Sequence, residues 1–462
     1  MVIIEHDEPK ASGRPTPQWY GDAKFGIFIH WGLYSVPGYA PASRTLHDVQ
    51  EAGDWDAWFR ENAYAEWYWN TMRIEGSSTS RFHAEHYGAD FAYEDFRGPF
   101  EAGLATWDPA EWLDVFRRAG ARYVIPTTKH HDGYRLWTSS IPNPRHGDYH
   151  PARDLIGELA AATGTAGLRF GAYYSGGIDW TFEPNVIRVN ADVRNATPES
   201  PEYVAYADAH WRELIERYQP ALMWNDISYP AGSDLERLFA EYYAAVPDGI
   251  INDRFSQRGR DGGKRTDPPY DIDTPEYTSF KETRTAKWES NRGIGFSFGY
   301  NRTEDARSFM SSAEIVHLLV DVVSKNGNLL LNTGPRGDAT LQPEQVERLL
   351  ETGAWLEANG EAIYGSRPWE IAEATTDGGG DVRFTAKGED LFATFLGQPA
   401  AGPHRLDGLA AADGTSVRLL ATGEPVSWRQ EGSALTLVVP DDLADAPAHS
   451  IAIRPSPRRI AQ

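Results

Sequence analysis

The sequence contains no cysteine among its 462 residues. Disulfide bonds, a thiolate nucleophile and cysteine-ligated zinc are therefore excluded. Long apolar runs are also missing, since no stretch approaches the roughly 18 consecutive apolar residues that a membrane-spanning helix needs. Residues 1–17 carry several charged side chains and no apolar core of the kind found in signal peptides. We therefore expect a cytoplasmic protein that has no membrane partner.

Positive charge is scarce. The chain carries 44 Lys and Arg against 67 Asp and Glu, a formal net charge of −23 at pH 7. Binding to nucleic acid or to an anionic membrane surface needs clustered basic residues, so we expect neither kind of partner. The composition does not determine the oligomeric state, and a homo-oligomer stays open.

Aromatic residues, in contrast, make up 12% of the chain and include 16 tryptophans. Most such side chains pack in protein cores, but carbohydrate sites also place aromatic faces against the C–H faces of sugars. The hydrophobic and charged fractions, 41% and 24%, are typical of soluble globular proteins. A length of 462 residues exceeds what one hydrophobic core usually supports, so we expect two domains.

Short apolar runs alternate with helix-like segments between residues 25 and 335. The strand candidates are FGIFIHWG (25–32), YVIPTTKH (123–130), RFGAYYS (169–175), ALMWND (221–226), GIIND (249–253), DIDTPEY (271–277), GFSFGY (295–300) and GNLLLNTG (327–334). This alternation predicts parallel strands with crossover helices, and eight strands are the number of a closed (β/α)8 barrel. A doubly wound open sheet is the alternative, but it often has a glycine-rich phosphate turn after its first strand. This chain has His30-Trp31-Gly32 there.

Helix signals lie between these strands. Asp108 followed by Pro109 predicts a helix that begins there and runs to Gly120. Apolar residues at helical spacing predict another helix over 200–218, and similar patterns predict helices over 233–246, 313–324 and 344–359. Residues 33–106 contain no strand candidate. Because they follow the first strand, we expect them at the carboxyl ends of the barrel strands, where functional loops gather.

The pattern changes after residue 366. Five short strand candidates are separated by Gly, Asp and Pro turns, which is typical of an antiparallel β-sandwich. We therefore predict a catalytic barrel over residues 1–366 and a C-terminal β-sandwich domain over 367–462. The sandwich contains no cluster of titratable residues, so we expect it to have a structural or accessory role. The five candidates are VRFTAKG (382–388), LFATFLG (391–397), SVRLLATG (416–423), SALTLVVP (433–440) and HSIAIRP (449–455).

Six successive strand candidates end in polar, reactive side chains. In barrel enzymes the active site forms at these ends. Asp226 alone is equally well explained as a helix N-cap, and Glu276 alone as a turn residue. Together they place two carboxyl groups at one face of the barrel, which glycoside hydrolysis ordinarily requires. The residues at the strand ends are His30, His130 with His131, Tyr173, Asp226, Arg254 and Glu276.

His130-His131-Asp132 also raises the question of a metal site, because histidine is the commonest metal ligand. Adjacent residues on a strand point to opposite faces, so two neighbouring histidines rarely bind one ion. Hydrogen bonding to sugar hydroxyls is the better functional interpretation, and a packed histidine pair is the structural one. We expect no metal and no cofactor.

The chain resembles the α-L-fucosidases of glycoside hydrolase family 29 over nearly its whole length. KFGIFIHWG (24–32) and KHHDG (129–133), in that order, are the most specific matches. The other matching stretches are Glu66-Trp67-Tyr68, Tyr173-Tyr174-Ser175, Trp224-Asn225-Asp226, Asn252-Asp253-Arg254, Arg292-Gly293-Ile294-Gly295 and Asn328-Leu329-Leu330-Leu331-Asn332.

The resemblance implies a retaining exo-α-L-fucosidase that acts on fucosylated oligosaccharides or glycoconjugates. Asp226 falls on the nucleophile position of the family and Glu276 on the acid/base of its bacterial members, with Glu66, Glu282 and Glu289 as alternatives for the second role. The positions that match the fucose site are His30, Glu66, Trp67, His130, His131, Tyr173, Trp224 and Arg254. Those that match the apolar wall around the C6 methyl group are Phe28, Tyr64 and Phe298.

Three other functions stay open. A catalytically silent fucose-binding protein would keep the pocket but lose a carboxylate, whereas this chain has both Asp226 and Glu276. A metal-dependent hydrolase would use His30, His130 and His131. An α-galactosidase-like enzyme on the same barrel is the nearest alternative substrate class.

Overall fold

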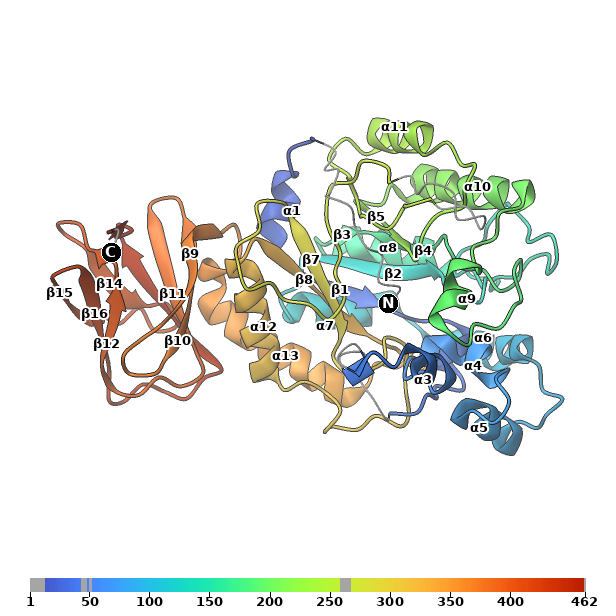
Figure 1. Cartoon of the computed structure of the whole chain (residues 1–462), viewed down its shortest axis with the longest axis horizontal. Helices are drawn as coiled ribbons and strands as arrows, with labels where there is room; N and C mark the ends of the chain where they lie inside the picture. Colours follow the sequence, from blue (N-terminus) through green and yellow to red (C-terminus); the bar gives the residue numbers. More distant parts are fainter. Residues whose placement is uncertain (1–12, 43–47, 50–51, 258–266, 461–462) are drawn as a thin grey trace.

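The computed structural model describes residues 13–42, 48–49, 52–257 and 267–460. A barrel of parallel strands with surrounding helices forms one part of the molecule, and antiparallel sheets follow it in the chain (Figure 1). The antiparallel sheets lie at the opposite end of the molecule from the short helices of residues 55–103 (Figure 1).

The barrel sheet has eight strands in the order β6-β5-β4-β2-β1-β8-β7, with β3 paired to β2. Every pair in it is parallel. The strands are almost entirely buried, because one face is inside the barrel and helices cover the other. Their bounds are β1 Phe25–Ile29, β2 Tyr123–Lys129, β3 Arg169–Phe170, β4 Ala172–Ser175, β5 Leu222–Asp226, β6 Ile250–Ile251, β7 Trp288–Gly293 and β8 Gly327–Thr333.

Single bridges close the barrel between β6 and β7. Asn252 pairs with Ile272, and Asp273 pairs with Trp288, both in parallel orientation. The candidate strand over 271–277 is therefore in the predicted place, but it forms isolated bridges instead of a continuous strand. The predicted (β/α)8-type barrel is confirmed, and the open doubly wound sheet is wrong.

The strand predicted over 295–300 is wrong. The strand of this region is β7, whose sequence WESNRG lacks an apolar pattern. Its polar side chains are buried because other residues satisfy them: Asn291, for example, donates its amide to the carbonyls of Thr274 and Pro275, both at 3.1 Å. Within 295–300, the backbone N–H groups of Phe296 and Ser297 both donate to Glu304 at 2.8 Å, so they do not join the sheet.

The predicted helices between the strands are confirmed to within a few residues. Asp108 caps the first of them by accepting the N–H of Ala110 at 2.9 Å. None of the helices in the described ranges has the length and apolar character needed to span a membrane. The bounds are α1 Gln18–Ala23, α7 Pro109–Arg118, α8 Leu155–Thr165, α9 Asn190–Arg194, α10 Pro201–Tyr218, α11 Leu235–Ala245, α12 Ser312–Ser324 and α13 Pro343–Asn359.

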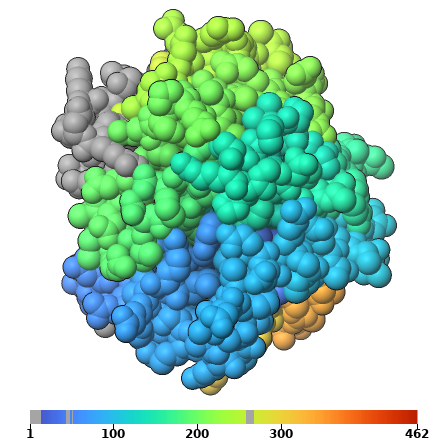
Figure 2. Space-filling view, turned by 90° about the vertical axis from the view of Figure 1, so that its right-hand side faces the viewer, coloured from blue at the N-terminus to red at the C-terminus, as the bar shows by residue number. Residues whose placement is uncertain are grey.

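The described residues between 33 and 106 form an insertion of short helices after β1. Figure 2 views the molecule from this end, where the blue insertion lies beside the green segment that contains α9. Asn70 joins the two, since its amide donates to the carbonyl of Ile187 at 2.9 Å and accepts the N–H of Ile187 at 2.8 Å. The helices of the insertion are α3 Trp55–Arg60, α4 Tyr68–Met72, α5 Ser78–His86 and α6 Arg97–Gly103, with 3-10 turns η1 Leu33–Ser35, η2 Ala65–Trp67, η3 Tyr93–Phe96 and η4 Leu104–Thr106.

The C-terminal region forms the predicted antiparallel sheets around a core of its own, which includes Phe384, Phe395 and Leu435. The sheet orders are β14-β17-β11-β10-β9, β12-β16-β15 and β13-β18. The domain boundary at residue 366 stays a prediction. The bounds are η5 Gly360–Ala362, β9 Arg367–Thr375, β10 Asp381–Lys387, β11 Asp390–Leu396, β12 Gly402–Asp407, β13 Leu409–Ala410, β14 Ser416–Leu419, β15 Ser427–Glu431, β16 Ala434–Val439, β17 Ala448–Arg454 and β18 Arg458–Arg459.

Candidate active site

A cavity of about 390 Å³ lies at the carboxyl ends of the barrel strands. All thirteen residues selected from the sequence line it, namely Phe28, His30, Tyr64, Glu66, Trp67, His130, His131, Tyr173, Trp224, Asp226, Arg254, Glu276 and Phe298. The structure adds lining residues that are not among these thirteen: Trp58, Phe59, Val193, Ile227, Asp253, Asp273, Thr274, Pro275, Phe280, Arg284 and Asn291. Insertion residues 58–67 supply one wall, so the position of the insertion at this end of the barrel is confirmed.

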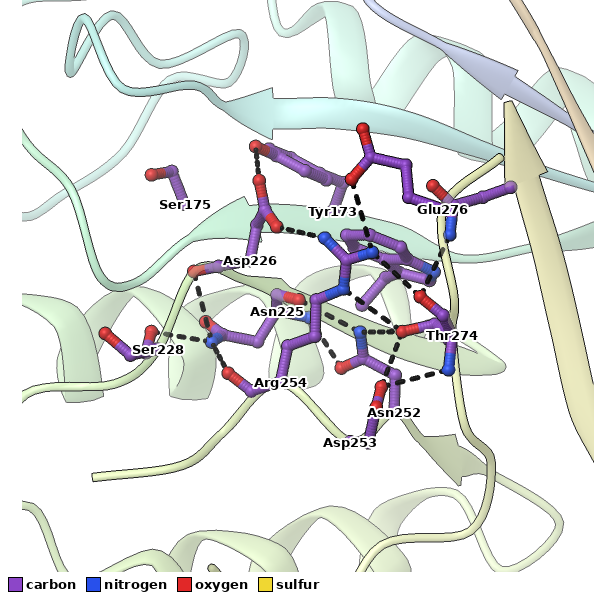
Figure 3. Close-up of polar contacts among 12 residues, drawn as sticks. Tyr173, Ser175, Asn225, Asp226, Ser228, Asn252, Asp253, Arg254, Thr274 and Glu276 are labelled. Carbon is purple, nitrogen blue, oxygen red and sulfur yellow. Dashed lines mark hydrogen bonds and ion pairs between the residues drawn. The ribbon is translucent and has the colours of Figure 1, made fainter. Parts of the chain in front are cut away.

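Asp226 is the last residue of β5 and is 8% exposed. One carboxylate oxygen, Oδ1, accepts a hydrogen bond from Nη1 of Arg254 at 2.7 Å, and Oδ2 accepts the hydroxyl of Tyr173 at 2.8 Å (Figure 3). Burial raises the pKa of Asp226, but the charge of Arg254 and these hydrogen bonds outweigh burial and lower the pKa below its ordinary value. Asp226 is therefore held as a carboxylate beside the cavity.

Glu276 comes from the segment that closes the barrel and is 6% exposed. Its Oε1 accepts the hydroxyl of Tyr64 at 3.0 Å, and its Oε2 lies 3.7 Å from Nη2 of Arg254. One guanidinium group thus stands between the two carboxyl groups (Figure 3). The hydroxyl of Tyr64 points to Glu276, so this residue offers a polar contact as well as its predicted apolar ring.

Arg254 is held in this position by the segment that carries Glu276. Its Nη2 donates to the carbonyl of Thr274 at 2.8 Å, and Asp253 accepts both the N–H and the hydroxyl of Thr274, at 3.1 and 2.5 Å. Residues 252–254 therefore orient the segment before Glu276. Sequence reasoning missed Thr274, although its place two residues before Glu276 was a usable signal.

The chain turns sharply after Asp226. Ile227 has φ +69, a left-handed conformation that is costly for a β-branched residue. The amide of Asn225 supports the turn by donating to the carbonyls of Ser228 and Arg254 at 2.8 and 2.7 Å (Figure 3). The surrounding hydrogen bonds therefore hold Ile227 in a strained backbone conformation directly beside Asp226.

His30 and His131 are neutral and present an unprotonated nitrogen. Burial lowers the pKa of His30 to about 4 and that of His131 to about 3. Nδ1 of His30 lies 2.7 Å from Oδ1 of Asn332, which can only accept, so Nδ1 carries the hydrogen. Nδ1 of His131 lies 2.6 Å from the hydroxyl of Ser175, which donates to Ile178 and therefore accepts from the ring. In both residues Nε2 is left as an acceptor.

His130 and Glu66 add further polar groups. His130 lines the cavity, and its Nδ1 is buried with no hydrogen-bond partner among the described residues. Glu66 is 2% exposed, and its Oε2 accepts the N–H of Gly299 at 2.8 Å. Burial raises the pKa of Glu66 to about 7.

The predicted apolar wall is formed by edge-to-face aromatic contacts. The ring of Phe298 lies 5.4 Å from that of Tyr64 and 6.3 Å from that of Phe28. These rings present a mostly apolar surface to the cavity, and the hydroxyl group of Tyr64 is turned to Glu276. Such a surface suits a methyl group better than a hydroxyl group.

The other glutamates considered for the acid/base role lie elsewhere. Glu282 is exposed and does not line the cavity. Glu289 is 0% exposed, and its oxygens are occupied by three donors inside the barrel. Within the described ranges, no group of three or more His, Cys, Asp or Glu side chains is arranged to hold a metal ion.

Comparisons with known proteins show the family of the chain. A family model described as alpha-L-fucosidase matches residues 4–361. The chain belongs to the α-L-fucosidase family. Its relatives include the alpha-L-fucosidase of Dictyostelium discoideum, which is 35% identical over 79% of this chain and 75% of that protein. The tissue alpha-L-fucosidase of Homo sapiens is 33% identical over 91% of this chain and 84% of its own length. Family membership makes the chain a glycoside hydrolase.

Solved structures of this family share the whole fold. The α-fucosidase of Thermotoga maritima in complex with a mechanism-based inhibitor is 44% identical and superposes with a TM-score of 0.85 over 95% of this chain and 96% of that chain. The structure of the same enzyme in complex with fucose has a TM-score of 0.84 at 44% identity and covers 95% and 97% of the two chains. Both the barrel and the C-terminal β-sandwich are therefore features of the family.

Proposed function

We propose that the chain removes terminal α-L-fucosyl residues from oligosaccharides or glycoconjugates by an exo-acting, retaining double displacement. Asp226 is the nucleophile and Glu276 is the general acid and base. The observation that supports this assignment best is that Arg254 contacts both carboxyl groups inside one cavity. Retaining glycosidases place their two carboxyl groups only about 5–5.5 Å apart.

In the first step, Asp226 attacks the anomeric carbon while Glu276 gives its proton to the departing glycosidic oxygen. The C–O bond to the leaving group breaks, and a β-fucosyl ester forms on Asp226. Arg254 and Tyr173 keep Asp226 ionised and oriented for this attack. Tyr64 holds Oε1 of Glu276 in position.

In the second step, Glu276 takes a proton from a water molecule that attacks the anomeric carbon from the opposite face. The ester bond breaks, Asp226 leaves as a carboxylate, and the product is α-L-fucose with net retention. A time course of the released sugar followed by NMR tests this mechanism, because a retaining enzyme releases the α-anomer first. Initial release of the β-anomer would contradict it.

Fucose lacks the 6-hydroxyl group of galactose, so the wall of Phe28, Tyr64 and Phe298 is expected to select it. An L-galactose hydroxyl group placed there would lose its water without gaining a partner, at a cost of about 1–3 kcal/mol or about 5- to 150-fold in rate. An aryl α-L-fucoside should therefore be cleaved faster than the matching α-L-galactoside, which differs only by the 6-hydroxyl group, and much faster than an α-D- or β-D-galactoside, which also differs in ring configuration. Equal values of kcat/KM on any of these galactosides would count against the pocket, and on a D-galactoside would favour the α-galactosidase-like alternative.

Glu66 is expected to control the acid side of the pH profile. Since its pKa is raised to about 7, Glu66 becomes protonated as the pH falls below 7 and loses acceptor strength for sugar hydroxyl groups. The value of kcat/KM should therefore fall by about tenfold per pH unit below pH 7. Glu66→Gln should lower kcat/KM by about 10- to 100-fold and remove this dependence. An unchanged acid limb in the variant would show that another group controls it.

The remaining properties are proposals drawn from the sequence. We infer a fucosylated substrate as the partner, with no nucleic acid and no membrane, on the basis of the formal net charge of −23. The cytoplasmic location stays a prediction, and the oligomeric state stays open. Retention of full activity in the presence of a chelator would argue against the metal-dependent alternative.

A further inference from the structure

A buried carboxylate that the proposed reaction does not use lies behind the cavity. Glu289 is on β7 and is 0% exposed. Tyr20 and Tyr123 donate their hydroxyl groups to its Oε2 at 2.8 and 2.5 Å, and Trp224 donates its indole N–H to Oε1 at 3.1 Å. These donors come from α1, β2 and β5, so Glu289 connects parts of the barrel that are far apart in the sequence.

The barrel is built to accommodate this carboxylate. Burial raises the pKa of Glu289, and the hydrogen bonds from Tyr123, Tyr20 and Trp224 oppose that rise. Gly26 makes room for one donor, since a Cβ atom there would lie 2.4 Å from the ring of Tyr123. A neutral side chain would accept the indole N–H without the cost of burying a carboxylate. The presence of an acid here therefore has a reason beyond filling the core.

Trp224 connects Glu289 to the catalytic groups. Its ring lines the cavity and stacks on Tyr173 at 5.5 Å. The guanidinium carbon of Arg254 lies 4.5 Å from the centre of the same ring, within the range of a cation–π interaction. An indole that donates its N–H to a carboxylate has a more electron-rich ring, which attracts a cation more strongly. Arg254 in turn donates to Asp226 at 2.7 Å.

We propose that Glu289 is a positioning residue, whose carboxylate holds the indole of Trp224 and, through the face of that ring, the guanidinium group of Arg254 against Asp226. The proposal rests on the proposed function, because it assumes that Asp226 is the nucleophile. Arg254 acts on the attacking carboxylate, to which it donates, so its position should affect the chemical step more than the binding of the sugar. Loss of the Glu289 carboxylate should therefore lower kcat and leave KM nearly unchanged.

The test compares Glu289→Gln with Tyr123→Phe. Both variants remove a hydrogen bond from the same buried cluster, so both should lower Tm. Only Glu289→Gln removes the negative charge next to the indole, and we expect it to lower kcat on an aryl α-L-fucoside by about 10- to 100-fold. Tyr123→Phe should retain nearly the full kcat. Equal values of kcat in the two variants, or an effect of Glu289→Gln on KM alone, would overturn the proposal.

A double-mutant cycle tests whether the effect passes through Trp224. Trp224→Phe keeps an aromatic ring but lacks the N–H group, so Glu289 has nothing to act through. The double variant Glu289→Gln/Trp224→Phe should then have the same kcat as Trp224→Phe alone. Additive losses in the cycle would show that Glu289 acts by another route. If Glu289→Gln fails to fold, full kcat in Trp224→Phe still refutes the proposal.

The activity of the wild-type chain distinguishes the proposed function from the role of Glu289. If the wild-type chain does not cleave the aryl fucoside, the proposed function is wrong. If the wild-type chain cleaves it and Glu289→Gln does so at the same rate, only the role of Glu289 is wrong. In ¹⁵N-tryptophan-labelled protein, the indole N–H signal of Trp224 is the one that disappears in Trp224→Phe. This signal should shift in Glu289→Gln, because the variant changes the acceptor of its hydrogen bond. An unshifted signal would also count against the proposal.

Discussion

Replacement of Asp226 by glycine should lower the turnover of aryl α-L-fucosides by about four to six orders of magnitude, because no other group can form the covalent intermediate. Asp226 is the carboxylate held at the end of β5 by Arg254 and Tyr173. Steady-state kinetics on an aryl fucoside measure the loss directly.

Azide should restore turnover of the Asp226→Gly variant. The small anion fits the space left by the side chain and attacks the anomeric carbon directly, so the product should be β-fucosyl azide. The matched control is Asp273→Asn. This residue also lines the cavity but is paired with Arg284 at 3.1 Å, and its variant should retain most of its turnover. Normal turnover of Asp226→Gly, or rescue that yields the α-azide, would refute the nucleophile assignment.

Replacement of Glu276 by alanine should have an effect that depends on the leaving group. A general acid contributes about 10²- to 10⁴-fold when the leaving group is poor, whereas an aryloxide of low pKa departs without a proton. Glu276→Ala should therefore cleave natural, alkyl-type fucosides about 10²- to 10⁴-fold more slowly than the wild-type chain. With activated aryl fucosides, the fucosyl-enzyme should still form rapidly. The fucosyl-enzyme should then accumulate, because water lacks its general base.

Azide distinguishes the roles of the carboxyl groups in this variant. It should speed the breakdown of the fucosyl-enzyme of Glu276→Ala and yield α-fucosyl azide with net retention. Glu66→Ala serves as the control, since loss of a sugar contact should slow both kinds of substrate alike. If Glu66→Ala shows the leaving-group dependence and Glu276→Ala does not, the acid/base assignment belongs to Glu66. The assignment of Asp226 would be unaffected.

The sequence alone predicts most of the barrel because its central strands are apolar on both sides. Runs such as those of β1, β2 and β8 are recognisable from composition, and β1 and β2 are each followed by a histidine at the carboxyl end. Since the carboxyl ends of parallel strands meet at one face, the sequence also predicts that His30, His130, Asp226 and Arg254 lie together. The family motifs add Glu66 and the apolar wall.

Other features depend on contacts between distant residues. The strand β7 was not predicted, because its polar side chains form hydrogen bonds with residues far away in the chain. Glu289, for example, accepts from Tyr20, Tyr123 and Trp224. The segment 271–277 was predicted as a strand, but the sequence could not show that it closes the barrel only through single bridges.

The electrostatics of the site were decided only by tertiary structure. The sequence names Asp226, Glu276 and Arg254 but not the hydrogen bonds between them. Only folding places one guanidinium group between the two carboxyl groups and directs the hydroxyl of Tyr64 to Glu276. Composition and periodicity report which residues avoid water, and this is enough to predict strands and strand ends. Directional hydrogen bonds between residues that are distant in the sequence leave no such local signal, so the cluster around Glu289 becomes visible only in the folded chain.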